Sequence, residues 1–384
     1  MNAGVSPRSR LPDVGVSIFA VMTRLANEHG AINLSQGFPD FDCAPELVTL
    51  VREWLGRGQN QYAPMAGVPA LRVGLARTIA SLYGAQYDPD SEITVTAGAT
   101  EALFAAITAL VHPGDEVVLF EPCYDSYVPA VQLAGGVPVF VTLRYPDYAI
   151  DWDEVRRALT ARTRLVLVNS PHNPTGMVLG EADLRQLAGL LDGTDVIVLS
   201  DEVYEHLVFD GRRHESLARV PALAARTAVI SSFGKTFHAT GWKVGYVAAP
   251  AAITTEIQRV HQFVTFAVNT PIQYAYAEFL ERGVAFDEVT RFYQGKRDRF
   301  IALLDGSRLR PLGCFGTYFQ LLDYSGITRD KDTDVAMWIL KEHGVASIPT
   351  SAFLYRSDSP PVLRFCFAKK DETLERAAER LRQV

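Results

Sequence analysis

Short apolar and β-branched runs alternate with helix-like segments through the middle of this chain. The runs are Ile93–Thr96, Glu116–Phe120, Arg164–Asn169, Val196–Asp201, Ala228–Ser232 and Lys243–Ala248. Helix-like segments follow several of them, among them Glu101–Val111, Asp153–Leu159 and Glu181–Leu191. This alternation predicts an α/β fold with a largely parallel sheet and helices on both faces. Because the runs are apolar throughout, their strands are expected to be covered on both sides.

The remainder of the chain predicts a second, smaller domain. From about Glu281 the helical stretches are longer, and the shorter strands Tyr318–Asp323 and Val362–Phe367 precede a terminal helix over Glu372–Arg382. A length of 384 residues suits one large α/β unit with such an accessory, or two to three domains.

Charge and hydropathy exclude several classes of partner. Lys plus Arg number 37 against 44 Asp plus Glu, a net charge of −7 that disfavours a nucleic-acid binder. The longest uncharged apolar stretch, Ala102–Val111, is shorter than the ~20 residues that cross a bilayer. The string MNAGVSPRSR has no apolar segment behind its arginines, so no secretory signal is expected. The four cysteines lie far apart, so neither a metal site nor a disulfide framework is expected. We expect the protein to be cytoplasmic.

Polar residues cluster where the predicted strands stop. They are Gly98, Ala99, Thr100, Asn173, Asp201, Tyr204, Ser232 and Lys235. In open α/β sheets, ligands bind beyond the carboxyl ends of the strands. Four strand ends of this kind therefore predict one shared site.

Motifs that would define other enzyme classes are missing. The string Gly234-Lys235-Thr236 resembles the end of a phosphate-binding P-loop, but Val229 stands where that loop needs a glycine. The sequence contains no G-x-G-x-x-G, H-E-x-x-H or G-x-S-x-G. These gaps disfavour a nucleotide triphosphatase, a dinucleotide enzyme, a metalloprotease and an α/β-hydrolase.

Each strand-end residue also has an ordinary structural interpretation. The turn at Gly98–Thr100 could hold a phosphate at a helix N-terminus, or could simply cap the helix. Asp201 after a buried strand needs a cation or several donors, or else serves as a helix cap or ion-pair partner. Lys235 is by default a solvated charge, but an apolar neighbourhood would lower its pKa and make the amine nucleophilic.

Seven strings taken together decide between these interpretations: NLSQGFPDF, NQYAPMAG, TAGATEAL, PHNPTG, SDEVYEHL, SSFGKTFHATGWKVGY and LRFCFAKK. With them the chain resembles the fold-type I, pyridoxal-phosphate (PLP)-dependent aminotransferases of class I/II from about Asn33 to the C-terminus. The wording is most similar to the kynurenine/methionine aminotransferase subgroup, and within it to the bacterial methionine aminotransferases. The resemblance implies an arm and part of the small domain over residues 1–45, a large PLP-binding domain over 46–280 and a small domain over 281–384.

The resemblance implies a cofactor role for each strand-end residue. Lys235 would carry PLP covalently and move the proton of the substrate α-carbon, while Asp201 would keep the ring nitrogen protonated. Asn173 and Tyr204 would bind the phenolic oxygen, and Tyr124 would stack on the ring, although a core tyrosine is an equally good interpretation.

The phosphate would be held by several groups: Gly98, Ala99, Thr100, Ser232 and Lys243. Many relatives carry an arginine at the position of Lys243, and a lysine supplies charge without a bidentate fork. Tyr62 resembles the tyrosine that reaches the phosphate of a neighbouring subunit, which implies a homodimer with active sites at the interface.

Substrate binding is implied for a second group of residues. Arg364, flanked by apolar residues on a strand, would bind the α-carboxylate, with a buried ion pair as the alternative. Asn173 would assist it. Gly37 and Phe38 would close over the substrate, and Tyr318 would add an apolar wall. A methionine side chain suits such a pocket, with aromatic amino acids, glutamine and kynurenine as further candidates.

Two other functions share parts of this pattern. A PLP-dependent C–S β-lyase uses the same lysine, aspartate and arginine, so the motifs barely separate it from an aminotransferase. A PLP sensor fused to a transcription factor would need a DNA-binding segment, and only about 30 residues precede the matching region. His112, His206 and His214 lack ligand-like spacing and are expected to be ordinary histidines.

Overall fold

A mixed seven-stranded sheet forms the centre of the molecule. The computed structural model describes residues 8–356 and 358–384, so the first seven residues of the expected arm lie outside the described part. The strand order is β2-β8-β7-β6-β5-β3-β4, and only β8 runs antiparallel to its neighbours. The strands are β2 (Ile93–Thr96), β3 (Glu116–Glu121), β4 (Val137–Thr142), β5 (Thr163–Asn169), β6 (Ile197–Asp201), β7 (Thr227–Ser232) and β8 (Gly245–Ala248). The predicted fold class is therefore confirmed.

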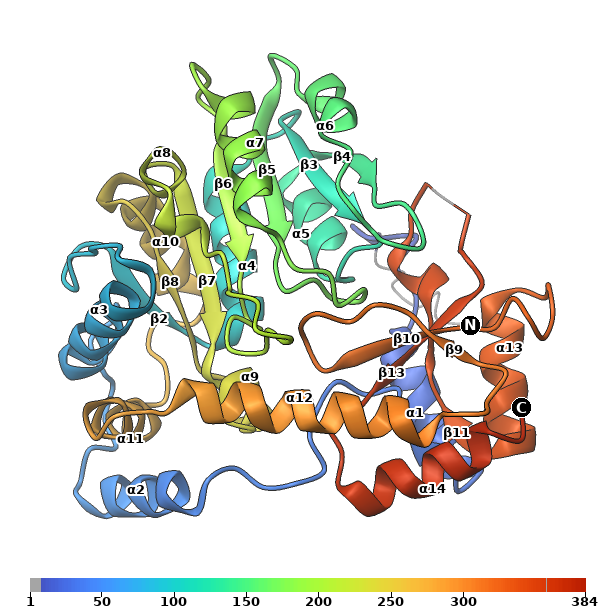
Figure 1. The fold of residues 1–384 in the computed structure, drawn as a ribbon. Helices are drawn as coiled ribbons and strands as arrows, with labels where there is room; N and C mark the ends of the chain where they lie inside the picture. Colours follow the sequence, from blue (N-terminus) through green and yellow to red (C-terminus); the bar gives the residue numbers. More distant parts are fainter. Residues whose placement is uncertain (1–7, 357) are drawn as a thin grey trace, which may run out of the picture.

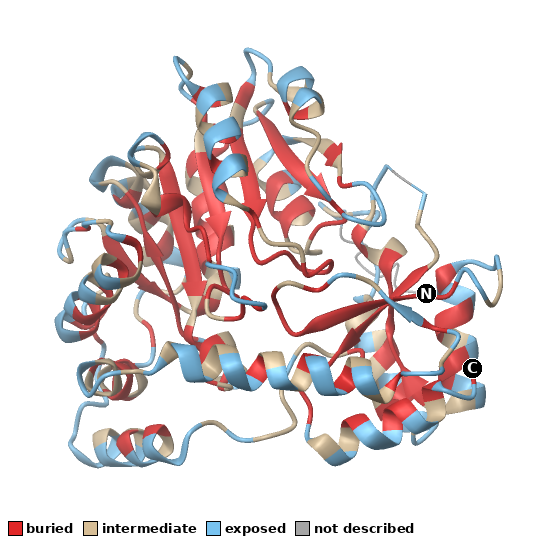
Figure 2. Ribbon diagram, in the orientation of Figure 1, coloured by how far each residue is buried: buried red, intermediate tan, exposed pale blue. Residues whose placement is uncertain are grey.

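Helices cover both faces of this sheet (Figure 1). One face packs on α4 (Gly98–Leu110), α5 (Tyr127–Ala134) and α10 (Ala251–Val264). The other packs on α3 (Pro69–Tyr83), α6 (Trp152–Ala158), α7 (Glu181–Leu191) and α11 (Thr270–Glu281). Neighbouring strand residues point to opposite faces, so Val118 and Leu119 belong to different core clusters. Figure 2 shows the strands buried and the outer faces of these helices exposed.

A second, four-stranded sheet, in the order β12-β13-β10-β9, lies at the C-terminal side. Its strands are β9 (Arg310–Pro311), β10 (Phe319–Asp323), β12 (Ile348–Pro349) and β13 (Val362–Cys366). Around it lie α1 (Ile18–Glu28), α13 (Asp332–Trp338), α14 (Asp371–Leu381) and the parallel pair β1 (Ile32–Asn33) and β11 (Val345–Ala346). Met22 and Ala26 of α1 share the core of this sheet, which joins the start of the described chain to its end.

The remaining elements connect these two bodies. Helix α12 (Phe286–Leu303) runs beneath both, and α2 (Pro45–Gly56) lies beside α11 (Figure 1). The short helical segments are α8 (Pro221–Ala224), α9 (Phe233–Thr236), η1 (Leu217–Arg219), η2 (Thr240–Trp242), η3 (Ile339–His343) and η4 (Thr350–Phe353). The division into domains at residues 45/46 and 280/281 stays a proposal. None of the described helices has the length and apolarity to cross a membrane.

Three differences from the sequence prediction concern the central sheet and its first covering helix. Strand β4 was not predicted, because Pro138 and partly exposed neighbours interrupt its apolar pattern. Helix α4 begins at Gly98, three residues before the predicted start at Glu101, so Gly98, Ala99 and Thr100 form its first turn. Strand β8 begins only at Gly245, because Lys243 adopts a left-handed backbone (φ 52°) that cannot continue a strand.

Candidate active site

A cavity of about 280 Å³ lies between the carboxyl ends of the central strands and the second sheet. Twelve of the predicted site residues line it: Gly37, Gly98, Ala99, Thr100, Tyr124, Asn173, Asp201, Tyr204, Ser232, Lys235, Lys243 and Arg364. The four predicted strand ends therefore do meet in one place. Its other lining residues include Phe19, Gln36, Leu103, Tyr127, Asn169 and Phe319.

Asp201 is the last residue of β6 and is 4% exposed. Tyr127 donates its hydroxyl proton to Oδ2 at 2.7 Å, and the Val203 amide approaches Oδ1 at 3.3 Å. Burial outweighs these hydrogen bonds and raises the pKa of Asp201 to about 6. A cationic hydrogen-bond donor placed in the cavity would therefore stabilise the ionised form of this carboxyl group.

Lys235 lies on α9, directly after the end of β7. Its Nζ donates to the Tyr318 hydroxyl at 2.9 Å and to the Gly37 carbonyl at 3.3 Å. Burial lowers the pKa of Lys235 to about 8, so a substantial fraction of the amine is neutral near physiological pH. A neutral buried amine can act as a nucleophile and as a base.

The first turn of α4 forms a cup that suits an anionic group. Gly98, Ala99 and Thr100 line the end of the cavity at this helix N-terminus, and Lys243 Nζ donates to Thr100 Oγ1 at 3.4 Å. Gly245 lets the turn lie directly on β8, because a Cβ there would come within 2.9 Å of the Ala99 nitrogen and 2.7 Å of the Ser231 carbonyl. Ser232 adds a hydroxyl from the end of β7.

Arg364 on β13 faces this cup across the cavity. It is 1% exposed, donates to Asn173 Oδ1 at 2.8 Å and Ser35 O at 3.1 Å, and lies 3.8 Å over the Phe319 ring. Its Nε has no hydrogen-bond partner among the described residues. Burial lowers the pKa of Arg364 to about 10. An unpaired buried guanidinium N–H favours binding of a carboxylate.

Two tyrosines contribute ring surface. Tyr204 is 2% exposed and packs edge-on against Tyr318, with ring centroids 5.1 Å apart. Tyr124 packs edge-on against Tyr127 at 5.6 Å, and burial raises its pKa to about 12. Both hydroxyls therefore stay protonated at neutral pH.

Two predicted residues do not line the cavity of the single chain. Tyr62 is 82% exposed, and its ring packs edge-on against Phe266 at 5.3 Å. Phe38 is 44% exposed, and its carbonyl accepts a hydrogen bond from Lys369 Nζ at 2.8 Å. Their roles stay predictions.

Tyr318 is not the bare apolar wall that the sequence predicted, because its hydroxyl accepts from Lys235 and donates to the Gly37 carbonyl. The ring of the next residue, Phe319, lines the cavity instead. Tyr318 directly precedes β10, and the rings of both residues pack edge-on against Tyr204, with centroids 5.1 and 6.0 Å away.

Sequence reasoning missed other contacts for lack of a signal. Tyr127 stands three residues after Tyr124, a spacing that could have suggested a shared helix face. Phe19 and Gln36 reach the cavity from the start of the chain, and no local pattern marks them. The structure shows no group of His, Cys, Asp and Glu that could hold a metal among the residues it describes.

The fold and this site together define a class of protein. Residues 29–381 match the family model for aminotransferase class I and II, and the chain belongs to this family. It is an aminotransferase, and its cofactor is PLP.

Within this family, the chain is similar to methionine and kynurenine aminotransferases. The chain is 50% identical to the methionine aminotransferase of Escherichia coli (strain K12) over 387 residues, 100% of each chain. It is 36% identical to the kynurenine–oxoglutarate transaminase of Dictyostelium discoideum, over 98% of this chain and 95% of the relative. A solved Escherichia coli structure, described with a methionine aminotransferase function, matches with a TM-score of 0.97 at 50% identity, covering 99% of this chain and 100% of that one. The predicted resemblance to the methionine/kynurenine subgroup is confirmed.

The residues present fit PLP on structural grounds. Gly245 leaves room at the cup, where a Cβ would collide with the Ser231 carbonyl and the Ala99 nitrogen, and Gly98 adopts a φ of +75° that other residues rarely adopt. The buried Asp201 carboxylate offers a partner for a protonated ring nitrogen, and the unpaired Arg364 Nε offers one for a carboxylate. Each charged part of the cofactor and of an amino acid thus has a counterpart in the cavity.

Proposed function

We propose that this aminotransferase takes the amino group from an uncharged amino acid, methionine above others, and passes it to a 2-oxo acid in two half-reactions. The observation that most strongly supports this proposal is that Arg364 is the only arginine among the described residues that line the cavity. One arginine serves the α-carboxylate and leaves a second, distal carboxylate without a partner. Desolvating such a group costs several kcal/mol, so we expect dicarboxylic donors to be disfavoured.

The apolar lining supports a long, flexible side chain. Phe19, Leu103 and Phe319 reach the cavity, and Phe319 lies beneath the Arg364 guanidinium. A thioether is polarisable and packs well against ring edges. The E. coli relatives named for methionine point the same way.

In this proposal the chain's own residues divide the chemistry. Bound PLP supplies an electron sink for the carbanion that forms when the α-proton leaves. Lys235 would hold the cofactor covalently, and its amine, once released, would take the proton from the substrate α-carbon and pass it to the cofactor. Asp201 holds a proton at the ring nitrogen.

The other residues position the cofactor and the substrate. Tyr204 and Asn173 bind the phenolic oxygen, and Tyr124 covers one ring face. The Ala99 and Thr100 amides, with Ser232 and Lys243, hold the phosphate. Arg364, with Asn173 and the Gly37 segment, orients the α-carboxylate so that the α-proton faces the lysine.

The test is kcat/KM for methionine, phenylalanine, glutamine, kynurenine and aspartate with one common 2-oxo acid. We expect methionine first and aspartate last. Aspartate in first place would contradict the proposal. Release of thiol, ammonia and pyruvate from an S-alkylcysteine, whose sulfur is on the β-carbon, without a new amino acid would indicate the C–S β-lyase instead.

We also propose a homodimer in which Tyr62 reaches the phosphate of the partner subunit. An exposed aromatic surface formed by Tyr62, Phe263 (86% exposed) and Phe266 (50% exposed) supports this proposal. Exposed apolar surfaces of this kind mark sites of protein–protein contact. Light scattering of the wild type should give about 85 kDa, twice the chain mass of 42.3 kDa. Phe263→Asp should yield monomer with weaker PLP binding. A fully active monomer would contradict the dimer.

We further propose a cytoplasmic protein, since the cysteines are free in the described residues.

A further inference from the structure

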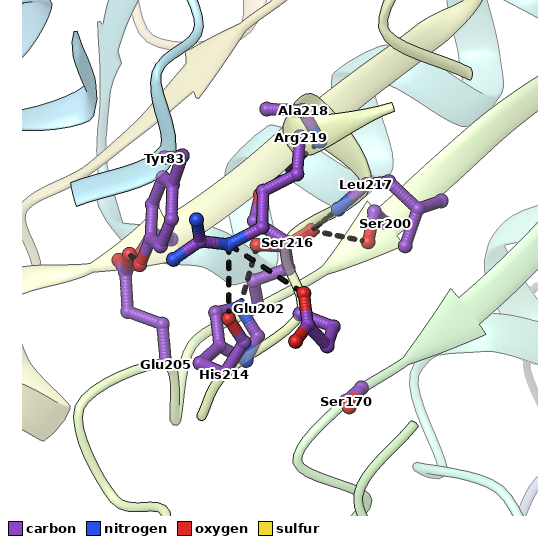
Figure 3. Close-up of polar contacts among 12 residues, drawn as sticks. Tyr83, Ser170, Ser200, Glu202, Glu205, His214, Ser216, Leu217, Ala218 and Arg219 are labelled. Carbon is purple, nitrogen blue, oxygen red and sulfur yellow. Dashed lines mark hydrogen bonds and ion pairs between the residues drawn. The ribbon is translucent and has the colours of Figure 1, made fainter. Parts of the chain in front are cut away.

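A buried carboxylate lies directly behind the site and takes no part in the chemistry proposed above. Glu205 follows Tyr204 at the exit of β6 and is 6% exposed. Its oxygens accept hydrogen bonds from the hydroxyls of Tyr83 on α3, Ser231 on β7 and Tyr246 on β8, the last at 3.1 Å. Figure 3 shows Glu205 and the Tyr83 hydroxyl side by side.

Two of the three partners of Glu205, Ser231 and Tyr246, are immediate chain neighbours of residues that form the site. Successive residues of a strand point to opposite faces, so Ser232 faces the cavity while Ser231 faces Glu205. The same holds on β8, where Tyr246 pairs across the strands with Ser231 and the adjacent Gly245 supports the phosphate cup. One carboxylate thus joins the ends of β6 and β7 to the start of β8 on the face opposite the cavity.

The hydrogen-bond pattern requires Glu205 to be ionised. Burial raises the pKa values of Tyr83 and Tyr246 well above their ordinary value, so both stay protonated and donate. Burial also opposes the charge of Glu205, but His206, His214 and the hydroxyl donors outweigh it and hold the pKa of this carboxyl below its ordinary value. A neutral side chain in its place would offer fewer acceptor positions to the same three donors.

A second carboxylate at the same turn serves a different segment. Glu202 accepts from Ser200 Oγ at 2.8 Å, His214 Nε2 at 2.8 Å and the Leu217 amide at 3.1 Å. Figure 3 shows this group next to Glu205 but directed toward the 214–219 loop. The Glu205 side chain, unlike that of Glu202, bonds side chains at the end of β7 and the start of β8.

We propose that Glu205 is a positioning residue for amino-group transfer, which holds Tyr204 and Ser232 at their working separation by tying the ends of β6 and β7 to the start of β8. It touches neither cofactor nor substrate and acts through the two strand ends. The inference rests on the proposed roles of Tyr204 and Ser232.

The test compares Glu205→Gln with a matched control in the full chain. Glu116 is also a buried carboxylate of the same sheet, 5% exposed and bonded to Thr160 Oγ1 at 2.6 Å, but it lies at the opposite end, where β3 begins. Glu116→Gln should lower the melting temperature and leave PLP binding unchanged. Glu205→Gln should also weaken PLP binding about tenfold and alter the visible circular dichroism of the bound cofactor.

Kinetics separate positioning from general destabilisation. At saturating PLP, Glu205→Gln should lower kcat about tenfold with little change in KM for methionine, because Arg364 lies on the other sheet. PLP affinity within twofold of wild type, or equal losses in both variants, would overturn the proposal.

A double-mutant cycle tests the route of the effect. Ser231→Ala is a milder change that keeps the chain folded, and it should weaken PLP binding in the same direction. Combined with Glu205→Gln, it should reduce PLP affinity little further, because both substitutions disrupt the same Ser231–Glu205 hydrogen bond. Fully additive losses would overturn the proposed link. These binding measurements do not depend on which amino acid is the donor, so a wrong donor assignment would leave them unaffected.

Discussion

The two halves of the cavity, which we propose to bind the cofactor and the substrate, are held together in different ways. The cofactor half comes from one sheet, where the strand register places Asn169 opposite Asp201 and Ser232 opposite Gly245. The substrate half joins distant segments, since Arg364 on the second sheet bonds Ser35 and Asn173, which lie 329 and 191 positions away in the chain.

This difference has a physical consequence. Hydrogen bonds of a continuous sheet fix all strand ends at once, so the cofactor half is rigid without help from its ligands. The substrate half depends on a few side-chain contacts between separate bodies. We therefore expect changes in the cofactor half to abolish chemistry and changes in the substrate half to alter selectivity.

The largest effect should follow from Lys235→Ala. The other strand-end residues should still hold PLP, now non-covalently, while the rate of transfer falls by at least about 10⁴-fold because the base is gone. Absorbance after dialysis measures retained cofactor, and single-turnover kinetics with methionine measure the rate. Normal turnover would remove Lys235 from the mechanism and break the comparison at its strongest point.

Asp201→Asn should lower the rate about 10³-fold, because the ring nitrogen loses its anionic partner. A rate within a few-fold of wild type would mean that Asp201 is only a structural cap.

The same variant should stabilise the apoprotein. Burial raises the folded-state pKa of Asp201 from 3.8 to about 6, so the unfolded chain ionises first as pH rises. Below pH 3.8 Asp201 is protonated in both states and its burial carries no cost of ionisation. As the pH rises to about 6, this advantage of the protonated form is lost and the buried group destabilises the fold. Above that pH the variant should exceed wild type by about 3 kcal/mol in free energy of unfolding. Chemical denaturation of both apoproteins at pH 3.5 and 7.5 checks the sign.

Arg364→Lys should show that the substrate half is separable. A lysine keeps the charge but loses the planar fork, so kcat/KM should fall about 10- to 100-fold, mostly through KM. PLP affinity and spectrum should match wild type, because the cofactor half does not depend on this residue. A large loss of PLP binding would show that the two halves are one unit.

The smallest effect should follow from Phe38→Ala. The ring is 44% exposed and packs under Lys369 Nζ at 4.8 Å, outside the cavity of the single chain. We expect a change of about 0.5–1 kcal/mol, a few-fold in KM for methionine, with kcat unchanged. A loss as large as that of Arg364→Lys would mean that the arm closes over the substrate.

The same contrast explains what the sequence could predict. Asp201, Lys235 and the Gly98–Thr100 turn follow apolar runs, and strand topology alone brings such ends to one edge. The hydroxyls that bond them could not be predicted, because Tyr127 and Tyr318 meet Asp201 and Lys235 through tertiary packing. Tyr318 and Gly37, which share a hydrogen bond, are 281 positions apart, and no local pattern encodes such a pair.

The reversed direction of β8 limits how this chain can change in length. Because β8 runs opposite to β7, the chain leaves Ser232 and returns at Gly245 on the same edge of the sheet, with Lys235 and Lys243 on one short connection. An inserted or deleted residue there would shift Lys235, the proposed covalent anchor, relative to Lys243, the proposed phosphate ligand. Insertions, affinity tags and new chain termini therefore belong in other surface connections, such as the turn at 305–307 that joins α12 to the second sheet.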